Sequence, residues 1–158
     1  MGQRSNALTN EFEAATAEFG QTVQAVPDDK WGADCDGGWT VGQVAEHVAG
    51  QFPLEMEFIT AAAEGRPLPG YNWDDVNAKN DGRAAQNKGM TREQVLATLN
   101  QHAPSVAAYL RGIDDGKLDS KSALPLANGA EVTTQQLIES GVLIDHVRAH
   151  LKSIQAVL

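Results

Sequence analysis

Three segments of the chain begin with a threonine that is followed three residues later by a glutamine, which is the pattern of a helix capping box. The pairs are Thr40 with Gln43, Thr91 with Gln94, and Thr133 with Gln136. In a capping box each side chain satisfies a backbone N–H of the other residue, so the start of the helix is set locally. Apolar residues recur at three- and four-residue spacing after each pair, as in an amphipathic helix. The sequence therefore predicts three long helices, which begin near residues 40, 91 and 133.

A fourth amphipathic helix is predicted ahead of the first capping box, and Pro27 ends it. Its apolar stripe consists of Leu8, Phe12, Ala15, Phe19, Val23 and Val26. The second and third helices are expected to end near Gly65 and Gly112. The last helix is expected to continue without a break through His150.

Two long connections separate these helices. Residues 65–89 are rich in proline and glycine, and their middle part, Trp73–Lys79, can form a short helix. Residues 114–130 show weak strand character and an Asn128-Gly129 turn signal, but no convincing sheet. We therefore predict an all-α, antiparallel-type four-helix bundle with long connections between helices 2 and 3 and between helices 3 and 4. It is expected to form a single domain over residues 1–158.

Charge and composition restrict the function classes. The chain carries 12 basic and 21 acidic residues, a formal net charge of −9, and its basic residues are scattered. Nucleic-acid binding is therefore disfavoured, because it depends on clustered Lys and Arg. No apolar run approaches the ~20 residues of a membrane span, and the N-terminus has no apolar signal region. We expect no membrane association and a cytoplasmic location.

The single cysteine, Cys35, excludes an internal disulfide and the multi-cysteine zinc frameworks. It stands between Asp34 and Asp36, whose carboxylates oppose formation of a thiolate. We interpret it as a loop cysteine. Any metal site must then use histidines and carboxylates.

Two of the four histidines, His146 and His150, are four residues apart and share one helix face with apolar neighbours. His47 falls on the apolar face of the second helix, whereas His102 lies toward the edge of the apolar face of the third. The candidate ligands are therefore His47, His146 and His150. His102 is left out of the site.

Three neutral imidazoles suit zinc, nickel, copper or iron(II). Three protein ligands also leave a coordination position open for water or substrate, as in catalytic rather than structural sites. The alternative is that the histidines are hydrogen-bonded core residues. Spacing leaves both interpretations open, because it does not show that two helices converge.

Other polar and aromatic residues are candidates for supporting roles. Gln51 and Glu139 share faces with the histidines and can orient their second ring nitrogens. Asn77 is a candidate substrate-binding group, whereas Glu46 and Glu57 are placed on the side of the second helix away from the histidines. The aromatic residues expected to pack at the bundle end are Trp31, Trp39, Tyr71 and Trp73.

The segment Gly38–Ala49, which contains Trp39-Thr40 and His47-Val48-Ala49, resembles the Trp-Thr/Ser-…-His-Leu/Val-Ala segment of the DinB-like superfamily. These proteins are also called YfiT-like metalloenzymes. The late His146-x-x-x-His150 pair matches the second metal-binding element of that family. Asp74–Ala78 resembles the short Asp-rich stretch before its third helix. The resemblance spans nearly the whole chain in order and spacing.

The resemblance implies a four-helix bundle that binds one divalent metal through His47, His146 and His150. Zinc or nickel is expected, with iron as an alternative. Relatives of this kind include enzymes that use mycothiol, bacillithiol or glutathione, such as maleylpyruvate isomerases and thiol S-transferases. The implied function is a thiol-dependent S-transferase or isomerase acting on a small electrophilic molecule. No catalytic residue beyond the metal ligands is assigned.

Two other functions stay open at this point. One is a non-enzymatic protein of the same family that binds a metal or small ligand in a stress response. The other is a helical interaction protein whose histidines belong only to the core. The resemblance also implies pairing through helix faces, so a homodimer is expected.

Overall fold

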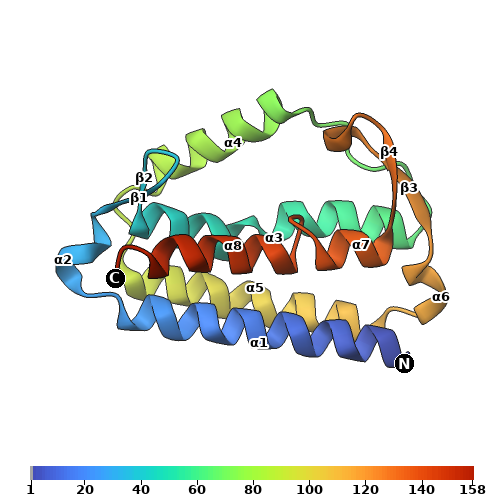
Figure 1. Ribbon diagram of the computed structural model, residues 1–158, viewed down its shortest axis with the longest axis horizontal. Coiled ribbons are helices and arrows are strands. Elements are labelled where there is room, and N and C mark those ends of the chain that lie inside the picture. Colours follow the sequence, from blue (N-terminus) through green and yellow to red (C-terminus); the bar gives the residue numbers. More distant parts are fainter. Residues whose placement is uncertain (1) are drawn as a thin grey trace.

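The computed structural model describes residues 2–158 and has the predicted all-α architecture of a four-helix bundle (Figure 1). The bundle helices are α1 (Gln3–Ala25), α3 (Val41–Ala63), α5 (Arg92–Gly112), and the pair α7 (Thr134–Glu139) and α8 (Ile144–Gln155). Both α1 and α3 pack against α5 and α8. Phe12, Phe52, Leu110 and Ile154, one from each bundle helix, are fully buried in the shared core.

The three capping boxes are confirmed. Thr40 Oγ1 accepts from the backbone N of Gln43 at 3.2 Å, and Gln43 Oε1 accepts from the backbone N of Thr40 at 3.0 Å. Thr91 and Thr133 cap α5 and α7 in the same way. A fourth, unpredicted box joins Asn72 and Asp75 and opens α4 (Trp73–Gln86), which is longer than the short helix expected there.

The prediction of one unbroken last helix is wrong. Helix α7 ends at Glu139 and α8 begins at Ile144. Between them Ser140 is extended, and its carbonyl oxygen accepts from the backbone N of both Leu143 and Asp145. Gly141 lies in this break, where a residue of low helix propensity lowers the cost of interrupting the helix. The break sets the position of α8, and therefore of His146 and His150.

Two short hairpins differ from the expectation that the chain has no sheet. One pairs β1 (Asp34–Asp36) with β2 (Trp39–Thr40), after the short helix α2 (Asp28–Trp31). The other pairs β3 (Lys121–Leu124) with β4 (Ala130–Thr133), after the short helix α6 (Asp115–Leu118). The second hairpin closes through a 3-10 turn, η1 (Pro125–Ala127), and the predicted Asn128-Gly129 turn. Both turn residues have positive φ, 55° and 78°, which suits these residue types. Strands this short produce no recognisable alternation of apolar and polar residues.

Helix α4 lies outside the bundle and carries the chain back along α3, so α3 and α5 run in the same direction (Figure 1). The prediction of an antiparallel-type bundle is therefore wrong for the pair α3 and α5, although the four-helix bundle itself is confirmed. The reason is that the connection between the second and third helices contains a helix long enough to span the bundle.

Glu46, which the sequence places on the side of α3 away from the histidines, is not exposed on that side. Its side chain is buried, and its Oε1 lies 2.7 Å from Nη2 of Arg83 on α4. Arg83 also donates to the carbonyl oxygen of Gly50. The polar contact explains why a carboxylate occupies a buried position, because a buried charge requires a partner. Glu57, in contrast, is exposed as predicted.

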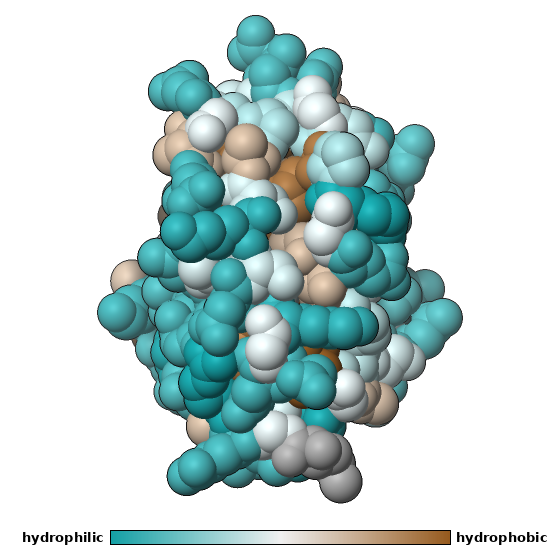
Figure 2. Space-filling view, turned by 90° about the vertical axis from the view of Figure 1, so that its right-hand side faces the viewer, coloured by the Kyte–Doolittle hydropathy of each residue, from teal (hydrophilic) through white to brown (hydrophobic). Residues whose placement is uncertain are grey.

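The end of the molecule that carries the N-terminus and the β3–β4 hairpin is mostly hydrophilic, with only small areas of hydrophobic surface (Figure 2). Within residues 2–158, no helix combines the length and the hydropathy that crossing a bilayer requires.

Candidate metal centre

The structure brings His47, His146 and His150 together. One nitrogen from each ring can be chosen so that the three atoms lie within 4.8 Å of one another. His47 Nε2 and His146 Nε2 are 2.9 Å apart, and the three rings stand nearly perpendicular to one another, at 80° to 89°. His47 comes from α3, and the other two are one turn apart on α8. The two helices pack against each other, which is the convergence that the spacing in the sequence could not establish.

The environment keeps two of these rings neutral. The pKa of His47 is lowered from 6.5 to about 2, mainly by burial and in smaller part by the neighbouring His146, His150 and Arg83. Burial and His146 lower the pKa of His150 to about 4, although Asp36 opposes this shift. Neutral imidazoles have a free lone pair at neutral pH, which is the form that binds metals.

Carboxylates contact the outer nitrogens of both α8 histidines. Glu55 Oε1 lies 2.5 Å from His146 Nδ1, and Asp36 Oδ2 lies 3.6 Å from His150 Nδ1. Burial raises the pKa of Glu55, while its contact with His146 opposes the rise. At His146 the carboxylate at Nδ1 orients the ring, and Nε2 faces His47. Neither carboxylate was predicted as a partner of the histidines, although Glu55 stands eight residues after His47 on the same helix.

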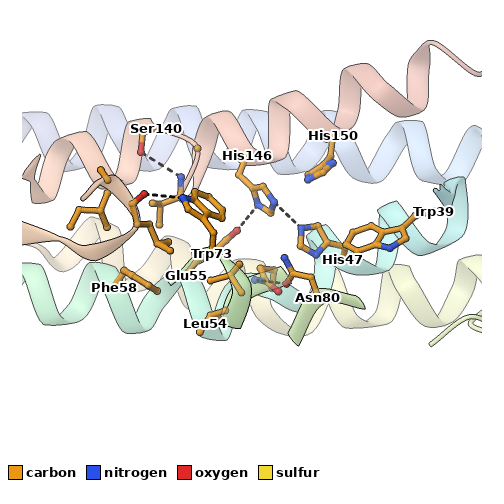
Figure 3. A pocket seen from close by; sticks show the side chains of 17 residues that line it. Trp39, His47, Leu54, Glu55, Phe58, Trp73, Asn80, Ser140, His146 and His150 are labelled. Carbon is orange, nitrogen blue, oxygen red and sulfur yellow. Dashed lines mark hydrogen bonds and ion pairs between the residues drawn. The ribbon is translucent and has the colours of Figure 1, made fainter. Parts of the chain in front are cut away.

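The histidines line one end of a cavity of about 490 Å³. Its walls come from α3, α4, α8, the break between α7 and α8, and the β3–η1 segment. The volume is in the range of small-molecule sites in proteins. Trp39, from β2, lies beside the histidines with its ring centroid 5.0 Å from that of His47 (Figure 3).

The supporting residues that the sequence suggested are only partly in place. Gln51 lines the cavity and donates to Asn80 Oδ1 at 3.3 Å. Glu139 does not reach the histidines, because it is exposed and accepts from Gln135 on its own helix. Asn77 is exposed and is not among the cavity-lining residues in the described chain. Asn80, about one turn further along α4, faces the cavity instead.

The aromatic residues divide between packing and the cavity. Trp31 donates to the carbonyl oxygen of Met90 and packs at the bundle end, as predicted. Trp39 and Trp73 instead line the cavity, and Trp73 Nε1 donates to the carbonyl oxygen of Leu126 at 2.9 Å. Cys35 and His102 are absent from the residues of 2–158 that line it.

The donor set fits a divalent metal. Two nitrogens that each lie 2.0–2.1 Å from one ion are about 2.9 Å apart at a right angle and about 3.3 Å apart in a tetrahedron, and the two closest Nε2 atoms are 2.9 Å apart. Nδ1 of His47 and Nδ1 of His150 are buried and have no hydrogen-bond partner among residues 2–158. Three convergent imidazoles would hold the ion, and the cavity would give a small molecule access to it.

A model of the DinB superfamily matches residues 11–154, which is nearly the whole chain. The chain belongs to the DinB superfamily. The sequence resemblance is therefore confirmed at the level of the family. A search of curated proteins finds no match to this DinB protein.

Solved structures show the same fold. The mycothiol-dependent maleylpyruvate isomerase aligns with a TM-score of 0.74 and 13% identity over 98% of this chain. This DinB protein spans only 63% of the length of that isomerase. YfiT from Bacillus subtilis, described as a probable metal-dependent hydrolase with an unusual four-helix bundle topology, aligns with a TM-score of 0.72 and 20% identity, over 99% of this chain and 87% of YfiT.

A third structure is the colibactin self-resistance protein ClbS in complex with double-stranded DNA. It aligns with a TM-score of 0.73 and 11% identity, over 97% of this chain and 94% of ClbS. At these identities the likeness establishes the fold of the DinB protein and not its reaction.

Proposed function

We propose that this DinB protein is a thiol-dependent S-transferase or isomerase that acts on a small electrophilic molecule and uses one divalent metal bound by His47, His146 and His150. The observation that carries the proposal is the convergence of three imidazoles at the end of a cavity large enough for a small molecule. Zinc or nickel suits three imidazole ligands, with iron as an alternative. Similar folds in a mycothiol-dependent isomerase and a probable metal-dependent hydrolase support a reaction of this class.

A divalent metal at this site would lower the pKa of a coordinating thiol and hold it as a thiolate. The residues of the chain prepare the site for this. Glu55 orients His146 through its Nδ1 atom, and Asp36 places a carboxylate 3.6 Å from Nδ1 of His150. Apolar walls by themselves would raise the pKa of a thiol, so the stabilisation of a thiolate would have to come from the metal.

Reconstitution followed by a conjugation assay tests the proposal. The protein is loaded with zinc, nickel or iron(II), and metal content is measured by elemental analysis. Mycothiol, bacillithiol and glutathione are then each offered with chlorodinitrobenzene as the electrophile. We expect one metal per chain and metal-dependent conjugation with at least one thiol. His102→Ala, on α5 and outside the histidine cluster, is the matched control for His146→Ala. A protein that binds no metal after reconstitution would overturn the proposal.

A non-enzymatic binding role is the second candidate, because the cavity and the histidines would serve it equally well. The two candidates differ in turnover. A protein that binds one metal but shows no metal-dependent conjugation with any of the three thiols favours the binding role.

The proposal includes a small-molecule partner and no nucleic acid. The net charge of −9 and the scattered basic residues support this choice, although the similarly folded ClbS was solved with DNA. Fluorescence anisotropy with a labelled DNA duplex checks it, and saturable binding at 150 mM salt would overturn it. We also propose that the protein is a homodimer and that it is cytoplasmic. Sedimentation velocity tests the dimer.

A further inference from the structure

We propose that the cavity accepts a neutral, largely apolar acceptor and discriminates against acceptors that carry a carboxylate at the end remote from the metal ligands. This inference names the substrate class and rests on the proposed function. The evidence for it is the chemistry of the cavity walls, which are polar beside the histidines and mostly apolar at the other end.

The two ends of the cavity are distinct in character. Beside the histidines stand polar side chains, namely Glu55, Gln51 and Asn80. The other end is mostly apolar, with Ser140 as the polar side chain labelled there in Figure 3, and its walls include Leu54, Phe58, Trp73, Leu124 and Leu126. Figure 3 shows Phe58 and Leu54 on the side away from His47 and His150. A bound acceptor therefore meets polar and titratable groups at one end and a mostly apolar, uncharged wall at the other.

The cavity offers a carboxylate no positive partner at its apolar end. Among the described residues that line it, none is Lys or Arg, and the only acidic one is Glu55. The two cationic residues of α4, the helix over the cavity, are engaged elsewhere. Lys79 Nζ lies 5.0 Å from the centre of the Tyr71 ring, and Arg83 is paired with buried Glu46.

An unpaired carboxylate in such a place is strongly disfavoured, because burying an ion without a partner costs far more than burying a neutral group. A metal at the histidines would attract anions only at its own end of the cavity. An acceptor with a second carboxylate at its far end would carry that charge into the region of Phe58 and Leu126. A dianionic acceptor of the maleylpyruvate kind is thus a poor match for these walls, despite the shared fold.

The polar end also indicates how a neutral acceptor would lie. Asn80 Oδ1 accepts from Gln51 Nε2, which leaves the Asn80 amide NH₂ to donate. A carbonyl oxygen on the acceptor is a suitable partner for this donor. The acceptor then presents its carbonyl side to the histidines and its apolar group to Phe58.

Calorimetric titration with a matched ligand pair tests the inference. Butyrophenone and 3-benzoylpropionate share a phenyl ketone and differ by a terminal methyl group against a carboxylate. Neither is a strong electrophile, so binding is measured without reaction at Cys35. We expect butyrophenone to bind the metal-free protein at least tenfold more tightly. Equal or tighter binding of the anion, or no binding of either compound, would overturn the inference.

A charge placed in the apolar wall provides the second measurement. Leu126→Lys adds a cation at the half-buried η1 turn and keeps the backbone carbonyl that Trp73 contacts. We expect this variant to bind 3-benzoylpropionate at least fivefold more tightly than the wild type does. Leu96→Lys, at a half-buried leucine of α5 outside the cavity, is the matched control. Equal affinity of the two lysine variants for the anion would contradict the charge argument.

The outcomes separate this inference from the proposed function. Ligand preference in the metal-free protein does not depend on metal binding or turnover. Metal-dependent conjugation together with preferred binding of the anion would leave the proposed function standing and remove the inference. Preferred binding of butyrophenone in a protein without turnover would support the inference and remove the proposed enzymatic function.

Discussion

Glu55 on α3 and His146 on α8 are in contact, with Oε1 of the carboxylate 2.5 Å from Nδ1 of the imidazole. The contact joins the two helices that supply the three histidines. It also selects Nε2 of His146 as the atom that faces His47. The carboxylate is buried, so its orienting effect acts with little screening by water.

We expect Glu55→Gln to weaken metal binding by about 10- to 100-fold, which is the usual effect of removing a carboxylate behind a histidine ligand. The amide keeps the shape of the side chain but loses its negative charge. Competition with a chromogenic chelator measures the affinity. Glu57→Gln, at an exposed position of the same helix, should leave the affinity unchanged. Equal affinities in the two variants would refute the orienting role of Glu55.

We expect His146→Ala to abolish stoichiometric metal binding, because two ligands then remain and the link to Glu55 is lost. Metal should also raise the melting temperature of the wild type and not that of the variant, since a ligand that binds only the folded state stabilises it. Differential scanning fluorimetry with and without a chelator measures this. An unchanged wild-type melting temperature after chelation would support histidines that are only core residues.

The metal-free protein should lose stability as the pH falls from 6.5 toward 4. The pKa of His150 is about 4 in the folded chain, below its ordinary value of 6.5. Between these values the unfolded chain binds a proton that the folded chain does not, so acid favours unfolding. The contribution of His150 is roughly 1–3 kcal/mol, and His47 acts in the same direction.

Urea unfolding at pH 7, 6, 5 and 4.5 measures this effect. Glu55 acts in the opposite direction, because its raised pKa makes the folded chain bind more protons above pH 4.5. The comparison is therefore made between the wild type and His150→Gln. The wild type should lose more free energy of unfolding than the variant over this range. Parallel pH profiles would show that His150 is not responsible.

Arg83→Met should lower the free energy of unfolding by roughly 2–3 kcal/mol, because it leaves the Glu46 carboxylate buried without its partner. This loss of stability is smaller than that expected for a fully buried ion pair, because 34% of the Arg83 side chain is exposed. Chemical denaturation measures it. Adding Glu46→Gln to Arg83→Met should restore part of the stability, and a further loss would contradict this account.

Gly50→Ala should destabilise the protein more strongly while Arg83 is present. A Cβ at residue 50 would lie 1.5 Å from Arg83 Nη2, so the guanidinium would have to leave Glu46. In an Arg83→Ala background the same change should cost less, because only Glu46 Oε1, 2.7 Å from the added Cβ, must then move, and alanine is the better helix former by about 1 kcal/mol. A double-mutant cycle by urea denaturation measures the coupling. Additive effects of the two substitutions would show that the missing side chain at residue 50 is not what lets Arg83 reach Glu46.

Structural features that depend only on residues close together in the chain were predictable from the sequence. The capping boxes need only residues three apart, so the starts of α3, α5 and α7 could be read directly. Apolar periodicity likewise placed His47, His146 and His150 on inward faces. It could not foresee the break at Ser140–Leu143, because the apolar residues on both sides keep helical spacing.

The sequence by itself determined the helices, their apolar faces and the three histidines that face the core. The tertiary structure alone decided that those histidines converge, that Glu55 and Asp36 contact them, and that Glu46 is buried against Arg83. The physical reason is the range of the interactions. Caps and periodicity depend on residues within one or two turns, whereas the burial of Glu46 and the chemistry of the cavity walls depend on how α4, α8 and the β3–β4 hairpin pack on α3.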